Sequence, residues 1–348
     1  MADIYSAIKI SDSVYWVGAI DWSIRDFHGY TTPHGSTYNA YLILADKITL
    51  IDTVKASFQD EMMARIASIV DPSKIDYIVS NHSEQDHSGC LLDVINRVRP
   101  KKVFASAMGV KTLGDIFHND CKIVPVKEGE SLSLGNMDLK FMEARMIHWP
   151  DSMFSYLEKE GVLFSQDAFG MHLATFERFA DDLPIDLLEY EAATYYANIV
   201  LPYSPVVLKT LEKVEATDWA IKVFAPDHGP VWRKDLAFMI DLYKKWARQK
   251  PTNKAVVVYA TMWHSTEMMA KAIAEALACE GVLVKLLSMN DVHRSEVVYE
   301  VLEAGALIVG SPTLNNNVLP QMADVMTYLK GLKPAHLIGA VFGSFGWS

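Results

Sequence analysis

The chain has 348 residues, half of them hydrophobic, and this length suits about two domains, each with a core of its own. No run approaches the ~18 consecutive apolar residues of a membrane span, and the first residues show no basic region followed by an apolar one, so no signal peptide is evident. The net charge, 32 − 43 = −11, argues against nucleic acid as a general partner.

Residues 1–250 mix short β patterns with helical ones. We expect strands at 13–17, 38–44, 47–51, 77–80, 103–105, 139–142 and 162–165. Helical patterns intervene at 58–69, 91–98, 184–200 and 235–248. Strands interspersed with helices predict an α/β fold built in layers.

The pattern becomes regular after Pro251, so we predict a second domain at 251–348. Near-continuous apolar strands are expected at 254–260, 282–287, 306–310 and 337–342, with helices at 265–279, 295–303 and 320–331. Such alternation is typical of a parallel sheet covered on both faces. The chain stops directly after the last strand, and we therefore expect this domain to be incomplete.

Side chains able to bind metal are concentrated in the segment Asn81–His87, which reads NHSEQDH. Further candidates follow at wide spacings, and the full set is His82, Glu84, Asp86, His87, His148, Asp167 and His228. Seven ligands exceed the needs of one tetrahedral ion, which indicates a site for two metals. Three carboxylates and four imidazoles without a thiolate favour iron or manganese over a thiolate-rich zinc site.

The segment resembles the His-x-His-x-Asp-His loop of the metallo-β-lactamase superfamily, with Glu84 in place of the second histidine. With 60, 18 and 60 residues before the three later ligands, the pattern is similar to that of the flavodiiron family, or A-type flavoproteins. The resemblance implies one iron on His82, Glu84 and His148, another on Asp86, His87 and His228, and a bridging Asp167. It also implies a metallo-β-lactamase-like αββα sandwich followed by a flavodoxin-like doubly wound parallel sheet. In some family members the histidine at the position of His87 is turned away, so this ligand is the one that varies.

Three further segments, 25–30, 148–152 and 195–198, are similar to family segments that line the approach to the metals. The resemblance implies pocket roles for His28, Trp149, Tyr195 and Tyr196. Plain core packing is the alternative for the aromatic side chains. Five solitary histidines are expected to take no part in the metal site: His118, His172, His264, His293 and His336.

A hydroxyl-rich loop at 261–266 separates the first strand of the second domain from its helix. It has neither Gly-x-Gly-x-x-Gly nor a P-loop lysine, so it resembles the monophosphate loop of flavodoxins, with a simple helix N-cap as the alternative. Loops at 311–317 and 343–348 leave the same sheet edge. The resemblance therefore implies FMN on Thr261, Met262, Trp263, His264, Ser265, Thr266, Ser311, Pro312, Thr313, Leu314, Asn315, Asn316, Asn317, Ser344, Phe345, Gly346 and Trp347, with Trp347 beside the flavin ring.

Membership of this family would make the protein an oxidoreductase that detoxifies dioxygen by reducing it to water. Nitric oxide reduction to nitrous oxide uses the same ligands and is the main rival, while a zinc hydrolase and a non-catalytic flavin-binding protein are more distant ones. No Cys-x-x-Cys module is present, so the expected electron donor is a separate rubredoxin, with a reduced deazaflavin coenzyme as the alternative. We also expect a head-to-tail homodimer or a dimer-based tetramer, and a cytoplasmic location.

Overall fold

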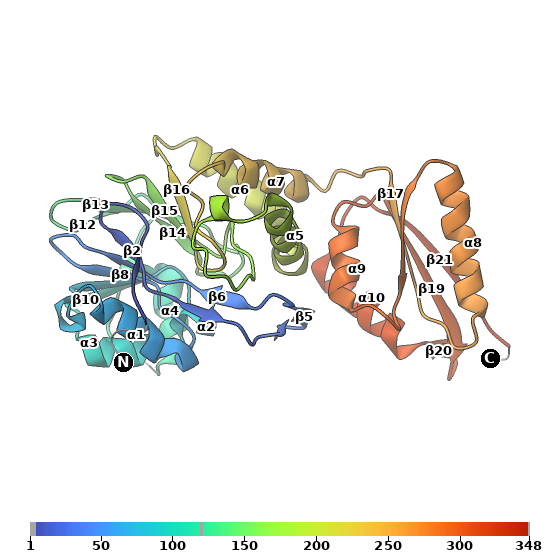
Figure 1. Ribbon diagram of the computed structural model, residues 1–348, viewed down its shortest axis with the longest axis horizontal. Helices are drawn as coiled ribbons and strands as arrows, with labels where there is room; N and C mark the ends of the chain where they lie inside the picture. Colours follow the sequence, from blue (N-terminus) through green and yellow to red (C-terminus); the bar gives the residue numbers. More distant parts are fainter. Residues whose placement is uncertain (1–4, 119–120, 347–348) are drawn as a thin grey trace. The chain divides into compact units, whose positions relative to one another are not determined.

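The computed structural model describes residues 5–118 and 121–346, and the chain divides into two compact units (Figure 1). The first unit contains Met1–Arg25, Thr32–Ala192 and Lys209–Ile240. The second contains Asp26–Thr31, Ala193–Leu208 and Asp241–Ser348. The domain boundary at residue 250 stays a prediction.

The larger sheet of the first unit has seven strands. In spatial order they are β1 (Ile8–Lys9), β2 (Val14–Trp16), β7 (Tyr41–Ile43), β8 (Thr49–Ile51), β9 (Tyr77–Ser80), β10 (Lys102–Ser106) and β11 (Ile123–Val126). The last four strands in this order run parallel, so their carboxyl ends lie at one edge. A separate two-stranded ribbon is formed by β3 (Ala19–Asp21) and β6 (Ser36–Tyr38).

The smaller sheet of this unit has five strands. Their order is β12 (Ser131–Ser133), β13 (Asp138–Glu143), β14 (Met153–Leu157), β15 (Val162–Gln166) and β16 (Val223–Pro226). The final pair is parallel, and the others pair in antiparallel fashion. Both β15 and β16 are buried along their full length, as expected for strands inside a layered fold.

Helices complete the layers of the α/β fold. Their bounds are η1 Ala56–Phe58, α1 Gln59–Ala67, η2 Pro72–Lys74, α2 Gln85–Ser88, α3 Leu91–Val98, α4 Ala107–Ile116, η3 Ala180–Asp182, α5 Ile185–Tyr195, the π-helix η4 Tyr196–Val200, η5 Leu201–Tyr203, α6 Ser204–Glu215 and α7 Leu236–Arg248. Local chemistry sets some of these ends. The Ser106 hydroxyl, for example, accepts a hydrogen bond from the Gly109 amide at 3.0 Å and caps α4.

Two cores follow from the alternation of side chains along the strands. On β10, Val103 and Ala105 point to the core shared with α1 and α3, whereas Phe104 points to the core between the two sheets. Phe164 of β15 fills this second core from the smaller sheet and is fully buried. The two sheets therefore pack face to face, with helices on the outer side of the larger one.

The second unit is built on a parallel sheet in the order β18 (Leu283–Ser288), β17 (Lys254–Tyr259), β19 (Ala306–Leu314) and β21 (Ile338–Ser344). In chain order this is 2-1-3-4, the doubly wound order of flavodoxins. Helix α8 (Ser265–Cys279) covers one face, while α9 (Arg294–Val301) and α10 (Pro320–Leu332) lie on the other (Figure 1). A short strand, β20 (Asn317–Val318), pairs with the end of β19.

Segments distant in the sequence join this second unit. The hairpin of β4 (Asp26–Phe27) and β5 (Tyr30–Thr31) meets α9, where the Thr31 and Ser295 hydroxyls lie 3.0 Å apart. The Tyr196 ring packs on Tyr243 and Trp246, with ring centroids 5.1 and 5.4 Å apart. Residues before 250 thus contribute to the second unit through the hairpin contact with α9 and through this aromatic cluster.

Most predicted elements are present, with ends that shift by a few residues. The strand at 38–44 is shorter and becomes β7, and the helix at 184–200 ends as α5, continued by the π-helix η4. The elements that were not predicted are α4, α6, β11, β14, β16 and several two- or three-residue strands. Across residues 5–118 and 121–346, no helix is long and apolar enough to cross a membrane.

Candidate metal centre and flavin pocket

The seven predicted ligands lie in loops that follow strands of the first unit. His82 and Glu84 follow β9, and the one-turn helix α2 presents Asp86 and His87. Asp167 directly follows β15. The remaining two ligands are His228, just after β16, and His148, in the turn between β13 and β14. Segments far apart in the sequence therefore supply one cluster.

The loop after β9 is held in place by a buried carboxylate. Asp52 accepts hydrogen bonds from the Asn81 backbone amide at 2.6 Å and from its Nδ2 at 2.7 Å. Asp52 has a positive φ of 54° at the end of β8, where its side chain can reach the neighbouring strand. This contact fixes the backbone immediately before His82.

One oxygen of Asp167 faces the first predicted set of ligands. Its Oδ2 lies 3.1 Å from His82 Nε2 and 3.1 Å from His148 Nε2. Glu84 Oε2 lies 3.2 Å from the same His148 nitrogen. Two imidazoles and a carboxylate thus converge on one side of Asp167, a donor set suited to a non-haem metal ion.

The other oxygen of Asp167 faces the second set. Its Oδ1 lies 3.6 Å from His228 Nε2 and 3.8 Å from His87 Nε2. Asp86 Oδ2 lies 3.2 Å and 3.4 Å from the same two nitrogens. The structure therefore brings all seven residues together, with Asp167 between two donor groups, as a bridging carboxylate requires.

The donor atoms themselves indicate that cations belong here. Among residues 5–118 and 121–346, His82 Nε2 and both oxygens of Asp86 and Asp167 are buried and have no hydrogen-bond partner. Buried polar atoms are costly when they are left without partners. Two divalent cations would satisfy these atoms together, so the residues fit a pair of metal ions.

The mutual charges of the cluster shift its pKa values. Burial opposes the charged imidazole of His82, but the Asp167 carboxylate outweighs it and raises the pKa of His82 well above its usual range. Burial likewise disfavours charge on His148, yet its contacts with the carboxylates of Asp167 and Glu84 raise its pKa to about 9. Burial also disfavours the charged carboxylate of Asp167, but the imidazoles of His82 and His148 outweigh this and hold its pKa well below its ordinary value. Without a cation, protons occupy these nitrogens, and metal binding must release them.

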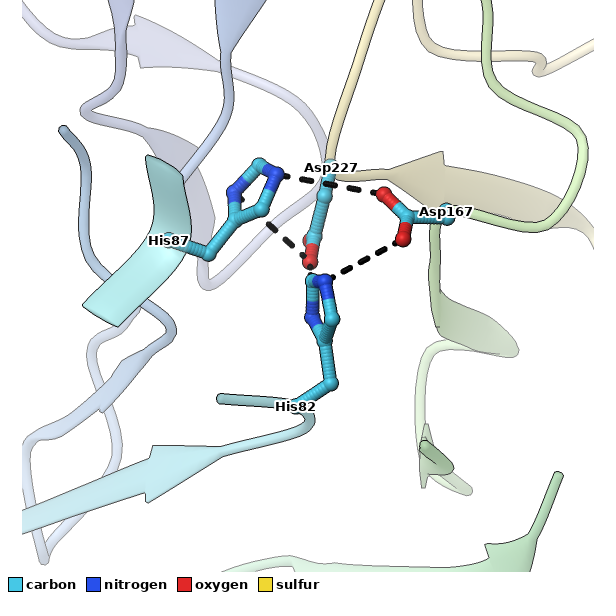
Figure 2. A group of neighbouring side chains, drawn as sticks. All are labelled: His82, His87, Asp167 and Asp227. Carbon is cyan, nitrogen blue, oxygen red and sulfur yellow. Dashed lines mark ion pairs between the residues drawn. The ribbon is translucent and has the colours of Figure 1, made fainter. Parts of the chain in front are cut away.

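Several buried groups support the ligands and were not predicted. Asp227 lies between His82 and His87, as Figure 2 shows. The Ser36 hydroxyl lies 2.6 Å from Nδ1 of His172, a histidine for which no site role was expected. The His172 and His228 rings meet edge to face at 4.5 Å. The proximity of Asp227 to His228 in the sequence was the available signal; Ser36 and His172 had none.

The four predicted pocket residues occupy different environments. Trp149 is half-buried in the turn after His148, where its amide donates to the Ser152 hydroxyl at 3.3 Å. Tyr195 and Tyr196 are buried, and Tyr196 belongs to the aromatic core of the second unit. His28 is exposed at the tip of the β4–β5 hairpin. Pocket roles for these four residues stay predictions.

The second unit holds a pocket of about 600 Å³ at the carboxyl edge of its sheet, a volume that suits a cofactor. Its walls come from the three loops predicted to hold flavin. The lining residues are Met262, Trp263, Ser265, Pro312, Thr313, Leu314, Asn315, Asn316, Ser344, Phe345 and Gly346. The pocket also opens beside the N-terminus of α8, whose free amides suit a phosphate.

The other predicted flavin residues are not among the lining residues. The Thr266 hydroxyl is 3.2 Å from that of Ser344, and the Ser311 hydroxyl accepts a hydrogen bond from the Leu319 backbone amide at 3.0 Å. His264 precedes α8 with a φ of 64° and pairs with Glu267 at 2.7 Å. Thr261 and Asn317 are not among the lining residues, and Trp347 lies outside the described residues. Their contacts with FMN stay predictions.

Comparisons with known proteins bear on both units. Residues 37–229 match the family described as ODP family beta lactamase, and residues 257–348 match the flavodoxin family. The chain is 49% identical to a rubredoxin-oxygen oxidoreductase of Megalodesulfovibrio gigas, covering 98% of this chain and 86% of that protein. It is 44% identical to a nitric oxide reductase of Moorella thermoacetica, again covering 98% of this chain and 86% of that protein. A solved structure of the flavodiiron protein from Giardia intestinalis superposes with a TM-score of 0.95 at 34% identity, covering 99% of this chain and 84% of that one.

Proposed function

This chain belongs to the flavodiiron family, and from that membership we propose that it reduces dioxygen to water at a diiron centre, using electrons passed from FMN. The observation that carries the proposal is the position of Asp167. Its two oxygens face two separate groups of nitrogen and carboxylate donors, at 3.1 Å on one side and 3.6 to 3.8 Å on the other.

The assignment of donors follows this division. His82, Glu84 and His148 would hold one iron, and Asp86, His87 and His228 the other. Reduction of dioxygen to two waters takes four electrons and four protons; when bound, two ferrous ions supply two of these electrons and reduced FMN the other two. The residues of the chain supply the geometry and the charge around the reacting oxygens.

The cluster has a closed side and a more open one. The side chains of His82, His87, Asp167 and His228 are at most 2% exposed. Those of Asp86, Glu84 and His148 are 8%, 9% and 13% exposed. Substrate and protons would therefore arrive from the side of Glu84, Asp86 and His148, while the closed side excludes water and keeps the imidazoles in place.

Nitric oxide is the second candidate substrate, since a relative at 44% identity is a nitric oxide reductase. Two molecules of nitric oxide need two electrons and two protons to give nitrous oxide and water. Turnover of each gas by protein loaded with iron and FMN, the nitric oxide assay under strict anaerobiosis, decides between them. Faster oxygen turnover supports the proposal, whereas nitrous oxide formation without oxygen turnover rejects it.

The electron donor proposed here is a rubredoxin, the protein named in the rubredoxin-oxygen oxidoreductase relative. A reduced deazaflavin coenzyme is the alternative. Mixing oxidised protein with each reduced donor and following flavin absorbance separates the two.

We further propose a head-to-tail homodimer, or a tetramer of such dimers, in the cytoplasm. Cys90, Cys121 and Cys279 are free thiols in the described chain, which suits that reducing compartment.

Metal analysis separates the proposal from a zinc hydrolase on the same scaffold. The proposal expects two irons and one FMN for each chain. Zinc at both positions together with hydrolytic activity would reject it. Bound flavin with neither metal nor gas turnover would instead support a non-catalytic flavin-binding protein.

A further inference from the structure

Asp227 is a fully buried carboxylate that lies behind two of the metal-ligand candidates. It directly follows β16, and its Oδ2 lies 3.5 Å from His82 Nδ1 and 3.9 Å from His87 Nδ1 (Figure 2). The backbone on both sides is fixed. The Asp227 amide donates to the Gln166 carbonyl at 2.9 Å, and its carbonyl accepts from the Asn39 amide at 2.7 Å.

The surroundings of this carboxylate offer few other partners. Within residues 5–118 and 121–346, neither side-chain oxygen has a hydrogen-bond partner, and no lysine or arginine pairs with it. The neighbouring Asp52 carboxylate is engaged by Asn81. Buried polar atoms without partners are costly, so the two imidazoles are the groups that can stabilise the Asp227 side chain.

The two imidazole rings share one orientation relative to Asp227. His82 turns Nε2 toward Asp167 Oδ2, at 3.1 Å, and presents Nδ1 to Asp227. His87 turns Nε2 toward Asp86 Oδ2, at 3.4 Å, and also presents Nδ1 to Asp227. When Nδ1 carries the proton and points to a carboxylate, the lone pair on Nε2 is available to a metal ion.

His228 shows how another imidazole of the cluster is held. Its Nδ1 lies 2.6 Å from the Thr37 carbonyl, a neutral acceptor. Asp227 instead offers a side-chain carboxylate oxygen, and His82 and His87 share it. These two histidines belong to different donor groups, one on each side of Asp167.

We propose that Asp227 is a positioning residue that orients one imidazole of each metal subsite and increases the donor strength of both. This inference depends on the proposed diiron function. A single carboxylate outside the ligand set would thus influence both metals together. Its loss is expected to weaken metal binding about 10- to 100-fold, the usual effect of removing such a partner.

The test uses the full chain loaded with ⁵⁷Fe and FMN, in the wild type and in Asp227→Asn and Asp227→Ala. Iron release to a ferrous chelator and the Mössbauer spectrum are measured under anaerobic conditions. We expect iron release to be about 10- to 100-fold faster in Asp227→Ala, a smaller change in Asp227→Asn, and altered spectra for both irons. The amide is nearly isosteric with the carboxylate, so Asp227→Asn keeps the test valid should Asp227→Ala fail to fold.

Glu300→Gln is the matched control, because Glu300 is a buried carboxylate of the second unit that pairs with Lys254 and Lys285. It should leave the iron spectrum and the release rate unchanged. Unaltered iron in both Asp227 variants, or a change confined to one iron, overturns the inference. A third metal ion that binds to the wild type and is lost in the Asp227 variants would also overturn it, because Asp227 would then be a ligand. A wild type that binds no iron would refute the proposed function itself, which distinguishes the two failures.

Discussion

Replacing Asp167 with asparagine removes the charge that faces both donor groups. The side chain is 1% exposed, and its oxygens lie 3.1 Å from two imidazole nitrogens and 3.6 to 3.8 Å from two more. Removing one partner from a buried charge pair costs about 3–5 kcal/mol. With about 1.4 kcal/mol for each factor of ten, iron affinity should fall between roughly a hundredfold and a few thousandfold.

The assay is anaerobic titration of the apoprotein with ferrous iron, followed by measurement of bound iron, flavin absorbance and oxygen turnover. We expect Asp167→Asn to lose one or both irons and its turnover while it keeps FMN, because the pocket lies in the other unit. Asp138→Asn, a change at an exposed carboxylate on β13, is the control and should behave as the wild type. Two tightly held irons and full turnover in Asp167→Asn would refute the bridging role.

Three further outcomes are expected. Because the pKa of unmetallated His148 is raised to about 9, iron must displace its proton below that pH. Apparent iron affinity should therefore rise as pH increases toward 9, by about tenfold per unit for each proton released, and affinity independent of pH in a titration series would contradict this. Ser265→Ala removes a hydroxyl from the flavin pocket and should weaken FMN binding by about 0.5–1.5 kcal/mol in a fluorescence titration, with iron content unchanged as the internal control. Phe164→Ala empties part of the core between the sheets and should lower the free energy of unfolding in urea by about 3–5 kcal/mol; an unchanged urea midpoint would show that Phe164 is not packed there.

The metal cluster was predictable from the sequence where its residues are close together in the chain. His82 to His87 form a recognisable string, and the wide spacings to Asp167 and His228 have meaning only through the family resemblance. Asp227 and His172 could not be assigned in this way. Asp227, which directly follows β16, meets His82 and His87 only in the folded chain. His172 likewise meets Ser36, which lies on the β3–β6 ribbon, only after folding.

The elements of the fold, too, could be predicted from the sequence only in part. The regular alternation after Pro251 predicts every main strand of the parallel sheet, because buried strands and amphipathic helices have distinct periods. In the first unit, β14 and β16 were missed although they are fully buried, since a short run without polar alternation does not distinguish strand from loop. The π-helix η4 was predicted as helix, but the wider hydrogen bonding of its backbone has no sequence pattern.

Anomalous diffraction at the iron edge, from crystals of the anaerobically iron-loaded protein, tests the central claim most directly. We expect two peaks about 3.5–4 Å apart, as in other two-metal sites, with one oxygen of Asp167 on each. A single peak, or two peaks that do not share Asp167, would contradict it.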